Sequence, residues 1–233
     1  EPLALASLLD AHHPGWREAS ADSEGQWSRS ATRLAAAEIA KRINEAAVLN
    51  PVNLVALALL ATPKHTADEQ ALHRLIGHYQ ALATEAPYSP NAIPCRLDAG
   101  EIVAYGERLG FVERFRDPLG DLIRVAAAQA PLLSYFRNNV LHLFALPAVI
   151  ACLLSLNRRL DANRVAQAVR GICTLMRAEL FLRWPPDELA GASEKIISVL
   201  LARGLLRRPD GSDRLAAPEP VSHASGEPLR SAP

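Results

Sequence analysis

The sequence is poor in aromatic residues and has no net charge. Aromatic side chains make up 5% of the 233 residues, methionine occurs once, and 25 basic residues balance 25 acidic ones. Because affinity for nucleic acids comes mostly from neutralising phosphates, this balance argues against a dedicated nucleic-acid-binding protein. We therefore expect no nucleic acid among its partners.

Cysteine is also scarce, with Cys95, Cys152 and Cys173 as the three examples. Their odd number and wide spacing exclude a regular disulfide framework and a cysteine-rich zinc site. Cys152 and Cys173 fall within apolar helical patterns, so we expect both thiols to be buried as small apolar side chains in a reducing compartment.

Long hydrophobic runs are absent. The longest apolar segment extends from Leu143 to Leu156 and contains Pro147, whereas a helix needs about 20 apolar residues to cross a bilayer. We expect no membrane span. Because the segment is apolar on all sides, a core helix is favoured, and peripheral association with a membrane surface through an exposed face is the alternative.

Common catalytic signatures do not occur. The sequence has no glycine-rich dinucleotide turn, no phosphate-binding loop and no serine-hydrolase elbow. His73 and His78 share a predicted helix, but their spacing does not align two metal ligands well. We therefore expect neither a cofactor nor a metal ion.

Alanine and leucine are abundant, which favours helix over strand. Apolar residues recur at helical spacing between caps and breakers, and Thr66 with Glu69 reads as a capping box. We predict a mainly α fold, a helical bundle-like domain with one or two short β-hairpins. We expect one helix to begin near Ser30 and another near Thr66. Five further helices are expected over Val52–Ala61, Asp98–Leu109, Leu143–Leu156, Ala162–Arg183 and Glu188–Arg203.

Two parts of the sequence repeat one outline of helix, glycine and hairpin. Gly110 and then a turn at Asp117–Gly120 follow the first helix, and Gly204 with Asp210–Gly211 take the same places after the second. This outline is typical of a winged helix. It leaves open an alternative function, a winged-helix-like module that binds nucleic acid or protein, with a basic group near the second wing formed by Arg203, Arg207 and Arg208.

The candidate site is a set of polar residues in two segments: Arg137, Asn138, Asn139, His142, Glu179 and Arg183. The first four precede the apolar segment, and the last two are neighbours at helical spacing. A buried carboxylate and a buried arginine usually need each other. We predict a buried polar network that joins the segments, for example by pairing Glu179 with Arg137; a substrate-binding role and a solvated chance cluster are the alternatives.

Six segments, in this order, are similar to those of a known family. They are Arg42–Ala47, Asn53–Ala61, Pro87–Ser89, Tyr135–Asn139 with His142, Leu146–Pro147 and Ala178–Trp184. Over residues 1–208 the chain resembles the bacterial membrane-bound glycerol-3-phosphate 1-O-acyltransferase. The resemblance implies transfer of a fatty acyl group from acyl-CoA or acyl-carrier protein to glycerol 3-phosphate, the first step of phospholipid synthesis, at the cytoplasmic face of the inner membrane.

The resemblance also implies chemistry by a His-x-x-x-x-Asp motif, with the histidine as general base. No histidine of this sequence has an aspartate at that spacing; His13 with Glu18 comes nearest, and Pro14–Gly15 lies between them. We therefore expect the catalytic residues to precede Glu1 and this chain alone to be inactive. Its expected role is structural, docking or membrane association, with an upstream acyltransferase domain as partner.

The resemblance divides the chain into three parts. Residues 1–28 are expected to be the end of the acyltransferase domain, and residues 29–216 a helical carboxy-terminal domain. Residues 217–233 are rich in proline, serine, alanine and glutamate and have almost no large apolar side chains. Such a segment cannot offset the entropy of ordering, so we expect a disordered tail.

Overall fold

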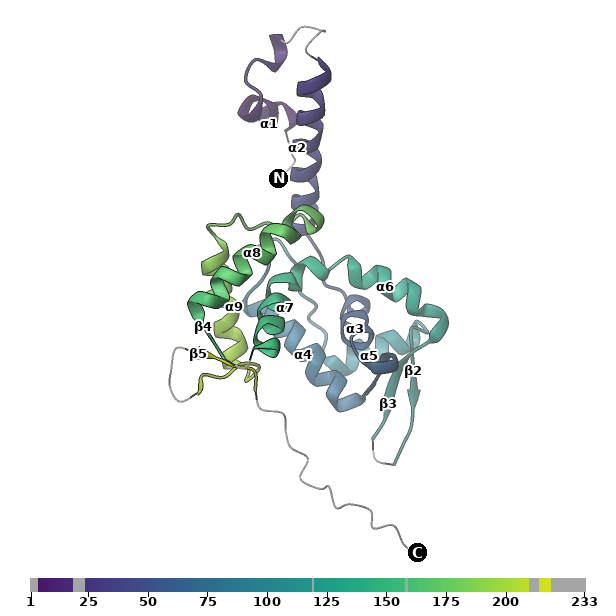
Figure 1. Cartoon of the computed structure of the whole chain (residues 1–233). Coiled ribbons are helices and arrows are strands. Elements are labelled where there is room, and N and C mark those ends of the chain that lie inside the picture. Colours follow the sequence, from purple (N-terminus) through teal and green to yellow (C-terminus); the bar gives the residue numbers. More distant parts are fainter. Residues whose placement is uncertain (1–3, 19–23, 119, 158, 210–213, 219–233) are drawn as a thin grey trace, which may run out of the picture.

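The computed structural model describes residues 4–18, 24–118, 120–157, 159–209 and 214–218. It is mainly helical with short antiparallel strands, as predicted (Figure 1). The helices are α1 (Leu5–His12), α2 (Glu24–Glu45), α3 (Pro51–Leu60), α4 (Glu69–Glu85), α5 (Ala99–Arg108), α6 (Ala130–Asn138), α7 (Leu141–Leu156), α8 (Ala162–Leu180) and α9 (Leu189–Ala202). The strands are β1 (Thr66–Asp68), β2 (Val112–Phe115), β3 (Leu122–Val125), β4 (Leu160–Asp161) and β5 (Arg214–Leu215).

The helix starts follow from capping residues. Asn50 and Asn53 form a reciprocal capping box at α3, with Pro51 in the first turn. Asp98 and Glu101 form another at α5. The predicted box of Thr66 with Glu69 is wrong: Asp68 caps α4 by accepting from the Ala71 N–H at 2.9 Å, because Thr66 is taken up in β1 opposite Arg124.

The elements from α3 to β3 form a winged helix, which we call the first unit. Strands β1, β3 and β2 lie in that order in one antiparallel sheet, next to α3, α4 and α5. The predicted hairpin of β2 and β3 is confirmed, with Val112 opposite Val125.

The elements from α7 to β5 repeat this topology, and we call them the second unit. Strand β4 pairs with β5, and an antiparallel bridge joins Ala216, just beyond β5, to Arg207. The second hairpin is therefore present as this bridge; its predicted turn at Asp210–Gly211 lies outside the described residues.

Backbone details of the two units correspond. Gly110 after α5 and Gly204 after α9 have φ values of 69° and 67°, which favour glycine. The next residue donates its N–H back into the helix in both, from Phe111 to Gly106 O at 2.9 Å and from Leu205 to Leu200 O at 2.8 Å. The repeat seen in the sequence is thus a repeat of structure.

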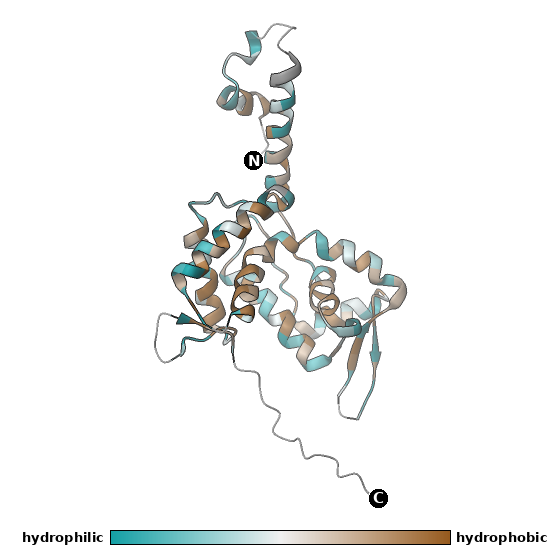
Figure 2. Ribbon diagram, viewed as in Figure 1, coloured by the Kyte–Doolittle hydropathy of each residue, from teal (hydrophilic) through white to brown (hydrophobic). Residues whose placement is uncertain are grey.

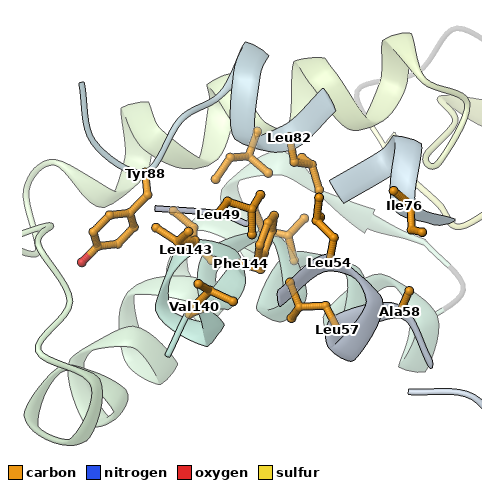
Figure 3. Close-up of a cluster of buried hydrophobic side chains, with 14 of the residues drawn as sticks. Leu49, Leu54, Leu57, Ala58, Ile76, Leu82, Tyr88, Val140, Leu143 and Phe144 are labelled. Atoms are coloured by element: carbon orange, nitrogen blue, oxygen red, sulfur yellow. The ribbon is translucent and has the colours of Figure 1, made fainter. Parts of the chain in front are cut away.

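One core cluster is shared by both units. The side chains of α3 are buried along most of the helix, mainly against α4, α5 and α6, and side chains of α7 from the other unit belong to the same cluster (Figure 3). Figure 2 shows α3 and α7 coloured as hydrophobic over much of their length. The segment predicted as a core helix, Leu143–Leu156, is confirmed as the main part of α7.

Helix α2 stands away from this body as a stalk, with α1 packed beside it (Figure 1). It begins at Glu24, earlier than the predicted start near Ser30, and runs without a break through the predicted domain boundary between residues 28 and 29. Most of the predicted disordered tail, residues 219–233, lies outside the described residues.

In the described part of the chain, no single helix is long and apolar enough to cross a bilayer. Residues 127–138 and α7 would reach the necessary length together, but they are bent by 85°. The polar residues before the apolar segment therefore do not continue straight into it, because the chain turns sharply at Asn139 and Val140.

Candidate functional site

The last turn of α2 is fixed to the second unit by two hydrogen bonds at Asn44. The Asn44 Nδ2 donates to the carbonyl of Leu180 at the end of α8, at 2.8 Å. The His142 Nε2 in the first turn of α7 donates to the carbonyl of Asn44 at 3.0 Å. One asparagine thus connects α2 with α7 and α8.

A buried asparagine connects α3 with α6. Asn53 is 2% exposed in an otherwise apolar helix. Its Oδ1 accepts from the Asn50 N–H at 3.0 Å, and its Nδ2 donates to the carbonyl of Phe136 at 2.7 Å. Both ends of the amide are satisfied, as a buried polar group requires.

Tyr88 and Arg183 form a third connection. The Arg183 backbone N–H donates to the Tyr88 hydroxyl at 2.8 Å, and its guanidinium donates to the Tyr88 carbonyl at 2.7 Å. The same guanidinium lies 3.6 Å from a Glu45 carboxylate oxygen. Burial raises the pKa of Tyr88 to about 12, so the hydroxyl remains protonated.

These contacts meet around one aromatic ring. The Tyr88 ring lies edge-on to His142, with ring centroids 5.2 Å apart, and to Trp184 at 4.8 Å. Figure 3 shows Tyr88 at the rim of the apolar cluster with its hydroxyl pointing outward. We call this set the polar junction: Asn44, Asn53, Tyr88, His142 and Arg183.

The junction is built to hold segments together. Most of its side-chain hydrogen bonds go to backbone carbonyls far away in sequence. Burial lowers the pKa of His142, and the bond to Asn44 only partly opposes this, so the ring is neutral near pH 7. A neutral histidine whose Nε2 donates to a carbonyl is not placed as a general base at that nitrogen.

A small polar cavity of about 310 Å³ borders the junction. It opens between α2, α3 and the α6–α7 turn. Its polar lining comes from Asn44, Asn50, Asn53, Asn139 and His142. Of the six predicted site residues, it brings together Asn139 and His142.

The other predicted residues are separated. Arg137 is half-buried, and its guanidinium reaches only as far as the amide oxygen of the adjacent Asn138, at 3.2 Å. Glu179 is exposed on α8, so the predicted buried pair of Arg137 with Glu179 is wrong. Arg183 pairs with Glu45 instead because α8 ends at Leu180, where Phe181 has a φ of 48° and turns the chain toward Tyr88.

The sequence-based prediction of the site missed Asn44, Asn53 and Tyr88. All three lie in segments quoted for the family resemblance. Asn53 carried a usable signal, because an amide inside an apolar helix must find partners when it is buried. The bonds of Asn44 and Tyr88 join residues 136 and 95 positions apart, and no local pattern predicts them.

A second cavity is apolar and lies between the two units, with a volume of about 630 Å³. Its walls come from α3, α4, α7, α8, α9 and the turn after α9, and we call it the seam pocket. Cys152 lines it and is exposed, so the expectation that this thiol is buried is wrong; Cys173 is buried as predicted. Among the described residues, no group of three or more histidine, cysteine or acidic side chains is placed to hold a metal ion.

The arginine of β2 in the first unit is paired within the fold. In the first unit the Arg114 guanidinium donates to Glu69, Glu107 and Asp121 at 2.7–2.9 Å. These carboxylates raise the pKa of Arg114, and the guanidinium in turn lowers the pKa of Glu69. The cation is therefore occupied within the fold.

Comparison with known proteins gives one consistent family. Residues 1–229 match the family described as the glycerol-3-phosphate acyltransferase C-terminal region. Proteins named glycerol-3-phosphate acyltransferase are 38% identical in Pseudomonas paraeruginosa PA7 and Pseudomonas aeruginosa UCBPP-PA14, and 37% identical in Pseudomonas putida KT2440. Each match covers 95% of this chain and 27% of the relative.

No solved structure is significantly similar to the chain. The chain spans about a quarter of the length of the curated relatives it matches, and it corresponds to their C-terminal region. The segments that form the polar junction are those on which the family resemblance rests. The chain belongs to the glycerol-3-phosphate acyltransferase C-terminal region family.

Proposed function

We propose that this chain is the part of a glycerol-3-phosphate acyltransferase that packs against an upstream acyltransferase domain and holds it in its working position. The whole enzyme would transfer an acyl group from acyl-CoA or acyl-carrier protein to glycerol 3-phosphate at the cytoplasmic face of the inner membrane. The polar junction carries this proposal, because its side chains are committed to backbone groups and none of those bonds presents a nucleophile with a base.

The stalk supports a docking role. Ile39 and Ile43 lie four residues apart on α2 and are 48% and 66% exposed, and Val48 just beyond it is 52% exposed. An apolar stripe on one face of a projecting helix is typical of a surface that another element covers. The junction fixes the base of this helix, so it sets the direction in which the stripe points.

A chimera tests the proposal. The matching C-terminal region of the Pseudomonas putida relative is replaced by this chain, and acyl transfer from palmitoyl-CoA to glycerol 3-phosphate is measured in membranes. We expect activity in the chimera, none in a deletion of the region, and none from the 233-residue chain alone. Turnover by the isolated chain would place catalytic groups within it, and a well-expressed chimera as inactive as the deletion would also contradict the proposal.

Charge on the stalk tests the docking surface. We expect Ile39→Asp combined with Ile43→Asp to lower the activity of the chimera at least about tenfold, because the aspartates would be desolvated in the interface. Leu175→Asp is the control, since Leu175 on α8 is 78% exposed and lies outside the stripe. Equal losses in both variants would show that the stripe is not the docking surface.

A further inference from the structure

The seam pocket is a cavity that the two units leave open between them. Its volume of about 630 Å³ lies within the range of roughly 300–1,000 Å³ that is usual for small-molecule sites. Leu57 of α3, Leu82 of α4 and Leu200 of α9 contribute to three of its sides. Apart from His78 and Tyr79, the lining residues are apolar.

The floor of the pocket is formed by small side chains of α7. Ala148, Ala151 and Cys152 line it and remain exposed, although α7 is otherwise one of the most deeply buried helices. Larger residues at these positions would close the space. Apolar surface left open in this way gains free energy when an apolar ligand covers it.

Two arginines lie beside the pocket at the edge where His78 lines it. Arg74 lies one helical turn before the lining residue His78 on α4, and Arg203 ends α9 two residues before Leu205, which also lines the pocket. Burial and the charges of Arg203 and Arg74 lower the pKa of His78. Arg203 also forms an ion pair with Glu85. An apolar cavity with guanidinium groups on one side is complementary to an apolar chain that ends in an anionic group.

We propose that the seam pocket binds the acyl chain of a single-chain anionic lipid, a 1-acylglycerol 3-phosphate, with its phosphate toward Arg74 and Arg203. This extends the proposed function, since such a lipid is the product of that reaction. The chain would lie along Ala148, Ala151 and Cys152, between the two units. Lipid bound there would add contacts between the two units.

Binding to the 233-residue chain tests the proposal directly. Titration calorimetry with 1-palmitoylglycerol 3-phosphate below its micelle concentration should show saturable binding to one site. Lysophosphatidylcholine with the same acyl chain should bind several-fold more weakly, and glycerol 3-phosphate alone should not compete. Absence of saturable binding, equal affinity for the zwitterionic lipid, or competition by the free headgroup would each overturn the proposal.

Two variants locate the site. Ala148→Trp should weaken binding at least about tenfold by filling the pocket, whereas Ala37→Trp, at an exposed position of α2, should leave it unchanged. Circular dichroism and thermal unfolding establish that both variants fold. Undiminished binding to a folded Ala148→Trp variant would place the lipid elsewhere.

Cys152 provides a measurement on the unaltered chain. Bound lipid should slow the alkylation of Cys152 by a maleimide several-fold, while buried Cys173 stays unreactive with or without lipid. Unchanged Cys152 reactivity at saturating lipid would overturn the proposal. Because none of these experiments involves acyl transfer, their failure would leave the acyltransferase proposal intact, and an inactive chimera would leave the binding result intact.

Discussion

The first and second winged-helix units have the same topology but are stabilised differently. The first has a three-stranded sheet, and the Arg114 network joins α4, α5 and the loop before β3. The second has two-residue strands and a single bridge at Arg207. The order and connection of helices and strands are thus the same in the second unit, although its sheet is reduced to a few hydrogen bonds, because the helices supply most of the core.

One pair of corresponding residues packs differently in the two units. In the first unit Gly106 lets α5 approach α3; a Cβ there would lie 3.3 Å from Val112 Cγ2 and 3.6 Å from Val55 Cγ2. In the second unit Leu200 takes the corresponding place before Leu205 and lines the pocket. The glycine thus allows close packing of α5 in the first unit, whereas the leucine side chain at the corresponding place borders a cavity.

The largest expected effect tests whether the units fold together. Ile102 on α5 and Ile196 on α9 hold corresponding places and are 0% and 3% exposed. Either change to alanine should cost about 2–5 kcal/mol of unfolding free energy. Because one core cluster includes both residues, each should shift the midpoint of a single urea transition; two transitions, one for each unit, would contradict the shared core.

Exchanging the distinguishing glycine should have the next largest effect. Gly106→Leu should destabilise the protein by about 1–3 kcal/mol through overpacking against Val55 and Val112. Gly77→Leu is the matched control, since no atom lies within 4 Å of a Cβ on that helical glycine, and loss of a helical glycine should stabilise slightly. Thermal unfolding of both variants measures the difference in stability. An unchanged stability of Gly106→Leu would show that the close packing of α5 does not depend on the glycine.

Removing the cation of the first unit should have a moderate effect. Arg114→Met leaves three carboxylates without their partner and should cost about 1–2 kcal/mol, allowing for partial solvent screening. The control is Arg124→Met, whose pair with Glu113 is about half exposed and should be worth less than about 1 kcal/mol. Chemical denaturation at pH 7 should show a larger loss of unfolding free energy in Arg114→Met than in Arg124→Met. Equal losses would contradict a stabilising role of the Arg114 network.

The same network predicts a pH dependence. The pKa of Glu69 is lowered from its usual 4.5 by the hydrogen bond to Arg114. Its contribution to stability is therefore present above pH 4.5 and is lost as the pH falls below it through the folded pKa. Stability measured from pH 6 to pH 3 should fall less steeply in Arg114→Met than in the unaltered chain.

The smallest expected effect concerns the polar junction, which ties the two units together. Burial lowers the pKa of His142 from its usual 6.5, so the unfolded chain takes up the proton first as the pH falls. The contribution of the neutral His142 ring to the unfolding free energy should be fully present above pH 6.5. It should decline gradually as the pH falls from 6.5 through the pKa of His142 in the folded protein. The His142 ring resonances should titrate below 6.5 in an NMR experiment; titration above that value would contradict the buried, neutral ring.

A substitution isolates this contribution. His142→Gln can keep a donor toward the Asn44 carbonyl without taking up a proton, so the decline in stability below pH 6.5 should become shallower. His65→Gln serves as the control, because His65 is exposed and lies outside the junction. An unchanged slope in His142→Gln would assign the decline to other groups.

Sequence reasoning succeeded where the signal is local. Asp98 and Asp161 cap α5 and α8 at, or one residue before, the predicted starts of these helices, and Gly110 and Gly204 follow helices as glycines with positive φ do. It failed where two local signals compete, as at Thr66, which joins a strand while Asp68 provides the cap. The capping pattern of Thr66 with Glu69 could not show that Thr66 would pair with β3, a strand far away in the sequence.

The sequence by itself determined the helical class, most helix ends and the repeated winged-helix outline, because these depend on composition, spacing and short-range hydrogen bonds. It also indicated the family, through the resemblance of six segments in the same order. The tertiary structure decided which polar groups meet. It joined Arg183 to Tyr88 and Glu45, left Glu179 in solvent and exposed Cys152 in the seam pocket. These outcomes depend on the direction in which each helix leaves its last turn, and packing between distant segments sets that direction.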